Sequence, residues 1–162
     1  MSATPLPALM EVRDLLAMLV GRDCEVSLAD ESVTPATEPG VVVGVYVTEF
    51  LRGEALVALD TVLAACLGGA IALIPAPTAL ASVGPGPLDE TLLENASEVL
   101  NVTASLFNVG DAPHLRLESI HDSGSGPLPA DIATWLRSYG PRLDVAVDVH
   151  GYGRGLLSVV LR

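Results

Sequence analysis

The longest stretch without a charged side chain, residues 61–88, limits the folds that are open to this chain. About 20 consecutive apolar residues can cross a bilayer as one helix, so a stretch of this length raises the possibility of a membrane span. Gly68-Gly69 and then Pro75 and Pro77 interrupt it, and no Arg lies close to its ends as an interfacial anchor would. We therefore expect these residues to be buried inside the protein, with no membrane span.

Helices are predicted wherever apolar residues recur at steps of three and four. This spacing predicts helices over residues 9–19, 61–67, 88–108 and 130–139. The first should end at Gly21 and the second at Gly68-Gly69, because glycine commonly ends a helix. Residues 74–87, with four Pro and two Gly, are expected to form an irregular linker.

Strands are predicted where β-branched residues dominate or apolar and polar residues alternate. These patterns predict strands over residues 24–29, 41–48, 53–60, 115–121, 143–149 and 156–161. The second and third of these should form an antiparallel hairpin, and the last two are joined by a glycine-rich turn. Strand pairs separated by helices favour an α+β fold, mainly an antiparallel sheet with packed helices, in a single domain over residues 1–162.

Charge excludes several classes of function. The formal net charge is −12, and all eight basic residues are Arg, so nucleic-acid binding is not expected. A chain without Lys has neither the nucleophile for Schiff-base chemistry nor the lysine of a phosphate-binding P-loop. Half of the residues are apolar and 17% are charged, which leaves apolar surface for a subunit interface.

Other polar and reactive residues look structural. Cys24 and Cys66 match no metal spacing and are expected to be buried, reduced thiols. Asp144 and Asp148 alternate with apolar residues, which predicts that both lie on the solvent side of a strand.

No bound metal or cofactor is expected in this chain. The three histidines are scattered over segments predicted to lie at strand edges and turns. The first residues lack the basic cluster and apolar run of a secretory signal, so we expect a cytoplasmic protein.

The third predicted helix carries a polar stripe. At 3.6 residues per turn, an arc of roughly 80° holds five polar side chains: Glu94, Glu98, Asn101, Ser105 and Asn108. Apolar side chains cluster on the opposite side, so the stripe should face away from the core. Asn is less favourable than Ala in a helix interior by several tenths of a kcal/mol, roughly, so Asn101 is an uncommon choice for a plain solvated face. The stripe is either an ordinary solvated face of the helix or a functional surface.

The segment Glu98-Val-Leu-Asn101 resembles the Glu-x-x-Asn signature of the CheC/CheX/FliY phosphatases of chemotaxis and flagellar signalling. The order of predicted elements is similar to that family over most of the chain, and one signature helix instead of two looks like CheX. The chain departs from the family pattern by having Glu94 where Asp or Ser is usual. It also lacks the Pro that usually follows the signature Asn, near Ser119 or Ile120.

The resemblance implies an enzyme that hydrolyses the aspartyl phosphate of a CheY-like receiver domain. In that role Asn101 orients the attacking water, and Glu98 pairs with a receiver lysine to fix the docking geometry. Glu94, Ser105 and Asn108 are then expected to contact the partner. The metal is the receiver's Mg²⁺, so this chain needs none, and the resemblance also implies a homodimer.

Two other functions stay open at this point. The first is a non-catalytic module that binds a receiver or a flagellar-switch partner through the same helix, which the missing Pro favours. The second is a dimeric ligand-binding domain that is unrelated to phosphorylation.

Overall fold

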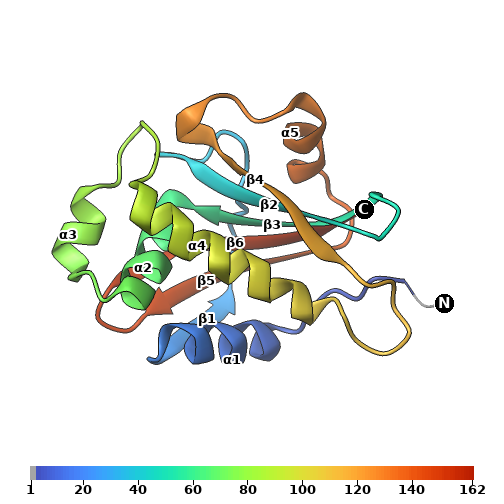
Figure 1. Cartoon of the computed structure of the whole chain (residues 1–162), viewed down its shortest axis with the longest axis horizontal. Coiled ribbons are helices and arrows are strands. Elements are labelled where there is room, and N and C mark those ends of the chain that lie inside the picture. Colours follow the sequence, from blue (N-terminus) through green and yellow to red (C-terminus); the bar gives the residue numbers. More distant parts are fainter. Residues whose placement is uncertain (1–2) are drawn as a thin grey trace.

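The computed structural model describes residues 3–162, and its central feature is one six-stranded sheet (Figure 1). The sheet order is β1-β5-β6-β3-β2-β4, and every neighbouring pair is antiparallel. The strands are β1 (Cys24–Leu28), β2 (Val41–Val47), β3 (Gly53–Asp60), β4 (Arg116–Asp122), β5 (Arg142–Val149) and β6 (Gly153–Leu161). The predicted α+β fold with a mainly antiparallel sheet is confirmed.

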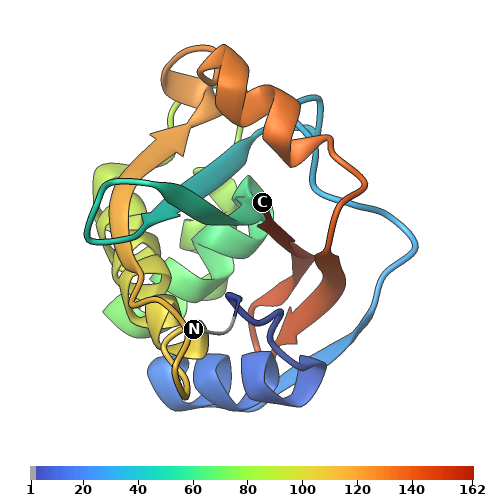
Figure 2. The same cartoon turned by 90° about the vertical axis from the view of Figure 1, so that its right-hand side faces the viewer.

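Helices cover both faces of this sheet. They are α1 (Leu9–Val20), α2 (Thr61–Ala72), α3 (Ala76–Ala81), α4 (Glu90–Thr103) and α5 (Ala130–Leu136), with short 3₁₀ turns at Ala104–Leu106 and Ser123–Ser125. Residues of α1, α2 and α4 share the larger hydrophobic core, whereas α5 packs into a smaller core on the other face. Figure 2, in which α5 lies apart from those three helices, shows this division.

Strand β2, which lies between β3 and the edge strand β4, contributes to both hydrophobic cores. Its four odd-numbered valines belong to the smaller core, while Val42 and Tyr46 belong to the larger one. All seven residues of β2 are buried. A strand that is buried on both faces appears in sequence as a continuous apolar run instead of an alternating one.

The charge-free stretch begins with α2, which packs between the sheet and α4. Most of its residues are buried, and it is apolar on all sides, as expected of a helix inside a core. No helix within residues 3–162 is both long and apolar enough to cross a bilayer.

The prediction that Gly68-Gly69 ends this helix is wrong, because α2 continues to Ala72. A Cβ atom on Gly68 would lie 2.5 Å from the Leu92 carbonyl oxygen of α4, and one on Gly69 would lie 2.9 Å from the Ala79 Cβ of α3. The two glycines therefore do not end α2. Because they have no side chain, they allow the neighbouring helices to pack closely against it.

The predicted irregular linker also contains a helix, α3. Pro75 precedes its first turn and Pro77 lies within that turn, where a missing N–H leaves no helical hydrogen bond unmade. The Tyr152 hydroxyl holds the start of this segment by donating to the Ile74 carbonyl oxygen at 2.6 Å. The prolines thus begin a short helix here.

Asp144 does not lie free on the solvent side of β5 as predicted, whereas Asp148 is exposed. The Arg142 guanidinium donates to both carboxylate oxygens of Asp144 at 2.9–3.2 Å, and the Ser158 hydroxyl donates to Oδ1 at 2.6 Å. The same guanidinium donates to the carbonyl oxygens of Leu136, the last residue of α5, and of Ser138, which follows the helix. Burial alone would raise the pKa of Asp144, but these hydrogen bonds and the Arg142 charge outweigh it and lower the pKa below its usual value.

Asp144→Asn should lower the free energy of unfolding by about 1–3 kcal/mol at pH 7, because it removes a charged acceptor from this network. A carboxyl group whose pKa is depressed in the folded state stabilises the fold above its unfolded pKa, and that contribution is lost as pH falls through the folded pKa. The difference between wild type and variant should therefore shrink below about pH 4. Urea unfolding at stepped pH measures it, with the exposed Asp148→Asn as the control, which should show no such difference.

Cys24 and Cys66 are buried free thiols, as expected. Burial raises the pKa of both, that of Cys66 to about 11, and nearby carboxylates act in the same direction. Both thiols therefore stay protonated at neutral pH and act as small core residues.

Candidate functional site

The candidate site is the exposed face of α4, whose N-terminal end is fixed by two aspartates. Asp89 caps the helix, since its Oδ2 accepts from the backbone N–H groups of Thr91 and Leu92. Asp122, at the end of β4, accepts from Leu88 N at 2.9 Å and from Gly124 N at 2.9 Å. The cap explains why α4 begins at Glu90, and Asp122 ties the start of α4 to the sheet.

The opposite face of α4 is packed into the larger core. Its buried residues, together with those of the turn that follows, are Leu92, Ala96, Val99, Leu100, Thr103, Ala104 and Phe107. They follow the spacing of three and four residues that the sequence predicted for the apolar side. A helix seated in this way presents its other face on a rigid support.

The predicted polar stripe lies on the outer face of α4, which runs across the front of the molecule in Figure 1. Glu94, Glu98, Asn101 and Ser105 are all exposed. Glu98 and Asn101 are three residues apart, or about 4.5 Å along the helix axis, and point the same way. Within residues 3–162, no hydrogen bond or ion pair engages any of these four side chains, so all four remain available to a partner.

Three polar side chains of α4 outside the stripe behave differently. Asn95 Nδ2 donates to the Thr91 carbonyl oxygen at 2.9 Å, Ser97 Oγ to that of Leu93 at 2.6 Å, and Thr103 Oγ1 to that of Val99 at 2.6 Å. Each of these side chains donates its hydrogen bond to a backbone carbonyl of the same helix, one turn earlier. Asn101 makes no such bond in the described structure and its amide is directed to solvent.

The fifth stripe residue, Asn108, lies beyond the end of α4 and is half-buried. Its Nδ2 donates to the Leu115 carbonyl oxygen at 2.9 Å, and its Oδ1 accepts from Leu115 N at 2.7 Å. Both ends of the amide thus hold the loop that leads into β4. This structural role was not predicted, because the predicted helix extended through residue 108.

Tyr46 of β2 supports α4 from beneath and was not singled out from the sequence. Its hydroxyl donates to the Leu100 carbonyl oxygen at 2.6 Å, and its side chain is completely buried. The two residues are 54 positions apart, so no local pattern connects them. The available signal was a single aromatic residue in a run of valines, two positions after Gly44 on the same face of the strand.

A groove runs beside the N-terminal half of α4. Leu93 and Ser97 line one side, and Ile120 and His121 of β4 line the other together with the loop that follows. Ser119 and Ile120, near which a Pro was expected from the resemblance, lie on β4, the strand beside this groove. Ser119 Oγ and His121 Nε2 are 3.2 Å apart there.

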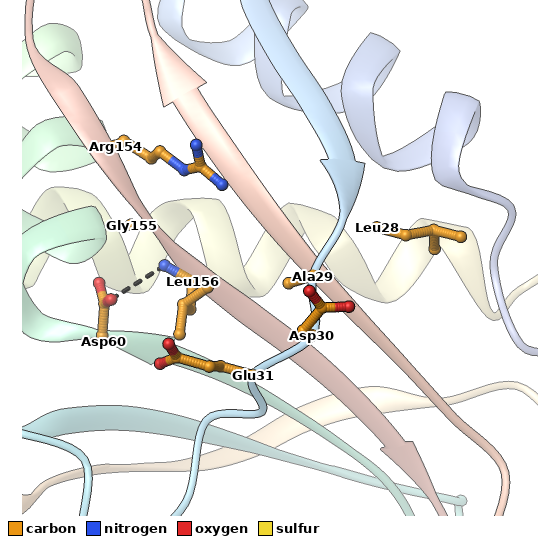
Figure 3. A pocket seen from close by; sticks show the side chains of 8 residues that line it. All are labelled: Leu28, Ala29, Asp30, Glu31, Asp60, Arg154, Gly155 and Leu156. Atoms are coloured by element: carbon orange, nitrogen blue, oxygen red, sulfur yellow. Dashed lines mark hydrogen bonds between the residues drawn. The ribbon is translucent and has the colours of Figure 1, made fainter.

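A second pocket lies where β3 ends and α2 begins, and α4 contributes no residue to it (Figure 3). Asp60 is its most buried acidic group, and both of its oxygens accept from backbone N–H groups, Leu63 at 2.8 Å and Leu156 at 2.9 Å. Burial raises the pKa of Asp60, and the two hydrogen bonds oppose that rise. Asp60 thus serves as the cap of α2, and the remaining charged groups, Asp30, Glu31 and Arg154, are exposed.

Within the described part of the chain, no group of three or more His, Cys, Asp or Glu side chains is placed to hold a metal ion. His114 and His150 are exposed, and His121 is half-buried beside Ser119.

No protein-family model matches the sequence, and no curated protein matches it either. Several solved structures are similar to the structure of this chain. A chain of the FliG–FliM complex from H. pylori has a TM-score of 0.62 at 10% identity, over 94% of this chain and 85% of that one. The FliM middle domain from Vibrio alginolyticus has a TM-score of 0.59 at 14% identity, over 94% and 86%.

A chemotactic CheC-like protein from Shewanella oneidensis has a TM-score of 0.51 at 12% identity, over 95% of this chain and 92% of that one. Identities this low show a shared fold and nothing finer. The α+β fold that the resemblance implied is thus confirmed. The CheX-like assignment and the roles of the stripe residues stay predictions.

Proposed function

We propose that this protein is a phosphatase of phosphorylated receiver domains, acting through the outer face of α4. The observation that carries the proposal is the pair Glu98 and Asn101. Both side chains are exposed and make no hydrogen bond or ion pair with any residue that the structure describes, on a helix whose other face packs into the core. An acid and a neutral amide one turn apart match the Glu-x-x-Asn signature in type and spacing.

The chemistry needs no covalent intermediate on this chain. The Asn101 amide accepts a hydrogen bond from a water molecule and donates one to a phosphoryl oxygen, which holds the water in line for attack. The water oxygen forms a bond to phosphorus while the bond from phosphorus to the receiver's aspartyl oxygen breaks. The products are a free carboxylate on the receiver and inorganic phosphate, which keeps the protons of the water.

Glu98 has the docking role in this proposal. Its carboxylate pairs with a lysine of the receiver, and Glu94 and Ser105, one turn further out on either side, contact the rim of the partner. The receiver's own Mg²⁺ neutralises charge on the phosphoryl oxygens, and with the lysine it offsets the net charge of −12 on this chain. A partner of this kind places the proposed activity in the cytoplasm.

We also retain a homodimer as part of the proposal. The sheet ends in β1 and β4, which each have one strand neighbour within the described structure. Leu28 at the end of β1 is 72% exposed, which leaves apolar surface at that edge.

The alternative function is a non-catalytic interaction module. It is favoured by the FliM structures, which have higher TM-scores to this chain than the CheC-like protein and which include complexes with FliG and with SpeE. A module of this kind would bind a receiver or a switch partner through the same helix face and leave the phosphoryl group in place.

Measuring the lifetime of phosphorylated receivers with this protein at catalytic amounts, in excess Mg²⁺, separates the two functions. A phosphatase shortens the lifetime with turnover. A binding module leaves it unchanged or lengthens it.

Removing the charge of Glu98 tests the docking role by itself. Glu98→Gln should raise KM for the phosphorylated receiver by roughly 3- to 10-fold, with a smaller change in kcat, because an interface charge pair is lost while the Asn101 amide stays in place. Steady-state kinetics at several salt concentrations measure both constants.

Glu49→Gln in the turn between β2 and β3 is the matched control, since it changes the net charge equally but lies on neither α4 nor an edge strand. It should leave KM unchanged. Equal rises of KM in both variants would show that overall charge, and not docking through Glu98, governs binding.

A further inference from the structure

The Tyr46 hydroxyl bonds to the backbone unit that carries Asn101. The Leu100 carbonyl, which accepts from Tyr46 Oη at 2.6 Å, belongs to the peptide group that joins Leu100 to Asn101. Because a peptide group is planar, fixing its oxygen also fixes the orientation of the Asn101 N–H and the start of the Asn101 residue.

Helix α4 tightens just after this carbonyl. In a continuing α-helix the Ala104 N–H would bond to the Leu100 carbonyl, but here it bonds to the Asn101 carbonyl as the chain enters the 3₁₀ turn. A buried carbonyl left without a partner destabilises a fold. The Tyr46 hydroxyl, from the side of the sheet, donates a hydrogen bond to the Leu100 carbonyl.

Strand β2 is irregular at Tyr46 on both of its edges. The pairing register of β2 shifts between Tyr46 and Val47 against β3, and between Val45 and Tyr46 against β4. Irregularities of this kind bend a strand and re-aim a side chain. Both occur at Tyr46, whose hydroxyl reaches the backbone of α4.

The surroundings hold the Tyr46 ring in one place. Gly44 lies beside both groups of this hydrogen bond, since a Cβ atom there would be in ordinary contact with the Tyr46 hydroxyl at 3.4 Å and with Leu100 Cδ1 at 3.5 Å, and in tight contact with Leu117 Cδ1 at 3.0 Å. The Phe107 ring packs against that of Tyr46 with centroids 5.3 Å apart. Burial raises the pKa of Tyr46 far above the physiological range, so its hydroxyl remains a donor there.

We infer that Tyr46 is a positioning residue for Asn101, through its hydrogen bond to the Leu100–Asn101 peptide group. The inference rests on the proposed function, because it assigns Tyr46 a part in orienting the water-binding amide. Tyr46 itself is completely buried and touches neither the partner nor the reacting atoms.

Tyr46→Phe removes only the hydroxyl and tests this role. Tyr152→Phe is the matched control, since Tyr152 also donates to a backbone carbonyl at 2.6 Å, that of Ile74, but in the segment before α3. Both variants lose one tyrosine hydroxyl and its 2.6 Å hydrogen bond to the backbone, and Tyr152→Phe also loses a longer bond to the Gly69 carbonyl oxygen at 3.3 Å. Chemical unfolding of the two variants measures their loss of stability.

Tyr46→Phe should lower kcat for receiver dephosphorylation by roughly 10- to 100-fold with KM within about twofold of wild type, because small misplacements of an orienting group act on the chemical step. Tyr152→Phe should keep both constants. Equal losses of kcat in the two variants, or an unchanged kcat in Tyr46→Phe, would overturn the inference.

Nuclear magnetic resonance separates a failure of this inference from a failure of the proposed function. The backbone and side-chain amide signals of Asn101 should shift and broaden in Tyr46→Phe and stay in place in Tyr152→Phe. If wild type shows no phosphatase activity, these signals decide alone: a change confined to Tyr46→Phe supports positioning, and unchanged Asn101 signals refute it.

Discussion

Asn101→Ala is expected to reduce kcat for receiver dephosphorylation by about 100-fold or more while the protein stays folded. The amide is the group that holds the attacking water in the proposed mechanism, and alanine offers neither a donor nor an acceptor. Because Asn101 is exposed and makes no internal side-chain hydrogen bond in residues 3–162, its removal leaves nothing unsatisfied. Ala is also the better helix former, so the free energy of unfolding should stay equal or rise slightly.

Asn95→Ala on the same helix is the control for this prediction. It makes the same chemical change, but Asn95 is off the stripe and its amide bonds to the Thr91 carbonyl oxygen. Phosphate release should be measured for both variants at saturating receiver, next to circular dichroism and unfolding curves. If Asn101→Ala keeps the wild-type kcat, the water is oriented by some other group and the proposed mechanism fails.

Gly68→Ala should lower the free energy of unfolding by about 1–3 kcal/mol, although helix propensity alone predicts a gain of about 1 kcal/mol. The added Cβ would lie 2.5 Å from the Leu92 carbonyl oxygen and 3.2 Å from Leu92 Cα, so α4 would have to move away from α2. Backbone atoms cannot rotate aside as the end of a flexible side chain can. Urea unfolding monitored by the fluorescence of Trp135 measures the change.

Gly84→Ala is the matched control, because nothing lies within 4 Å of a Cβ at that position. Its free energy of unfolding should change by no more than about 0.5 kcal/mol. A Gly68→Ala variant that is as stable as wild type would show that the α2–α4 contact has room to adjust, and that the glycine is not needed for close packing.

Periodicity predicted the exposed stripe on α4 well, because which residues share a face is a local property of one helix. Glu94, Glu98, Asn101 and Ser105 fall on one face for any α-helix over these residues, and the buried residues opposite them confirm which face turns inward. Asn108 was the exception. The helix tightens into a 3₁₀ turn at Ala104, and the Asn108 side chain then bonds to Leu115.

The packing role of Gly68-Gly69 and the network around Asp144 were not predicted from the sequence, because both depend on contacts between distant segments. Gly68-Gly69 carries the same local signal as a helix end, and only the approach of Leu92 from α4 reveals its packing role. Asp144 alternates like a solvent-facing residue, yet Ser158 of the neighbouring strand completes its network. Partners of this kind are set by sheet order and helix crossing, which periodicity does not encode.

The central claim is that the protein catalyses loss of the phosphoryl group, and the decay of phosphorylated receivers tests it most directly. Receivers of the host are phosphorylated in excess Mg²⁺, and inorganic phosphate is followed with this protein present at about one-hundredth of the receiver concentration. The account predicts that at least one receiver loses its phosphoryl group faster, with many turnovers per molecule of this protein. Unchanged or slower decay for every receiver would contradict it and favour a binding module with the same fold.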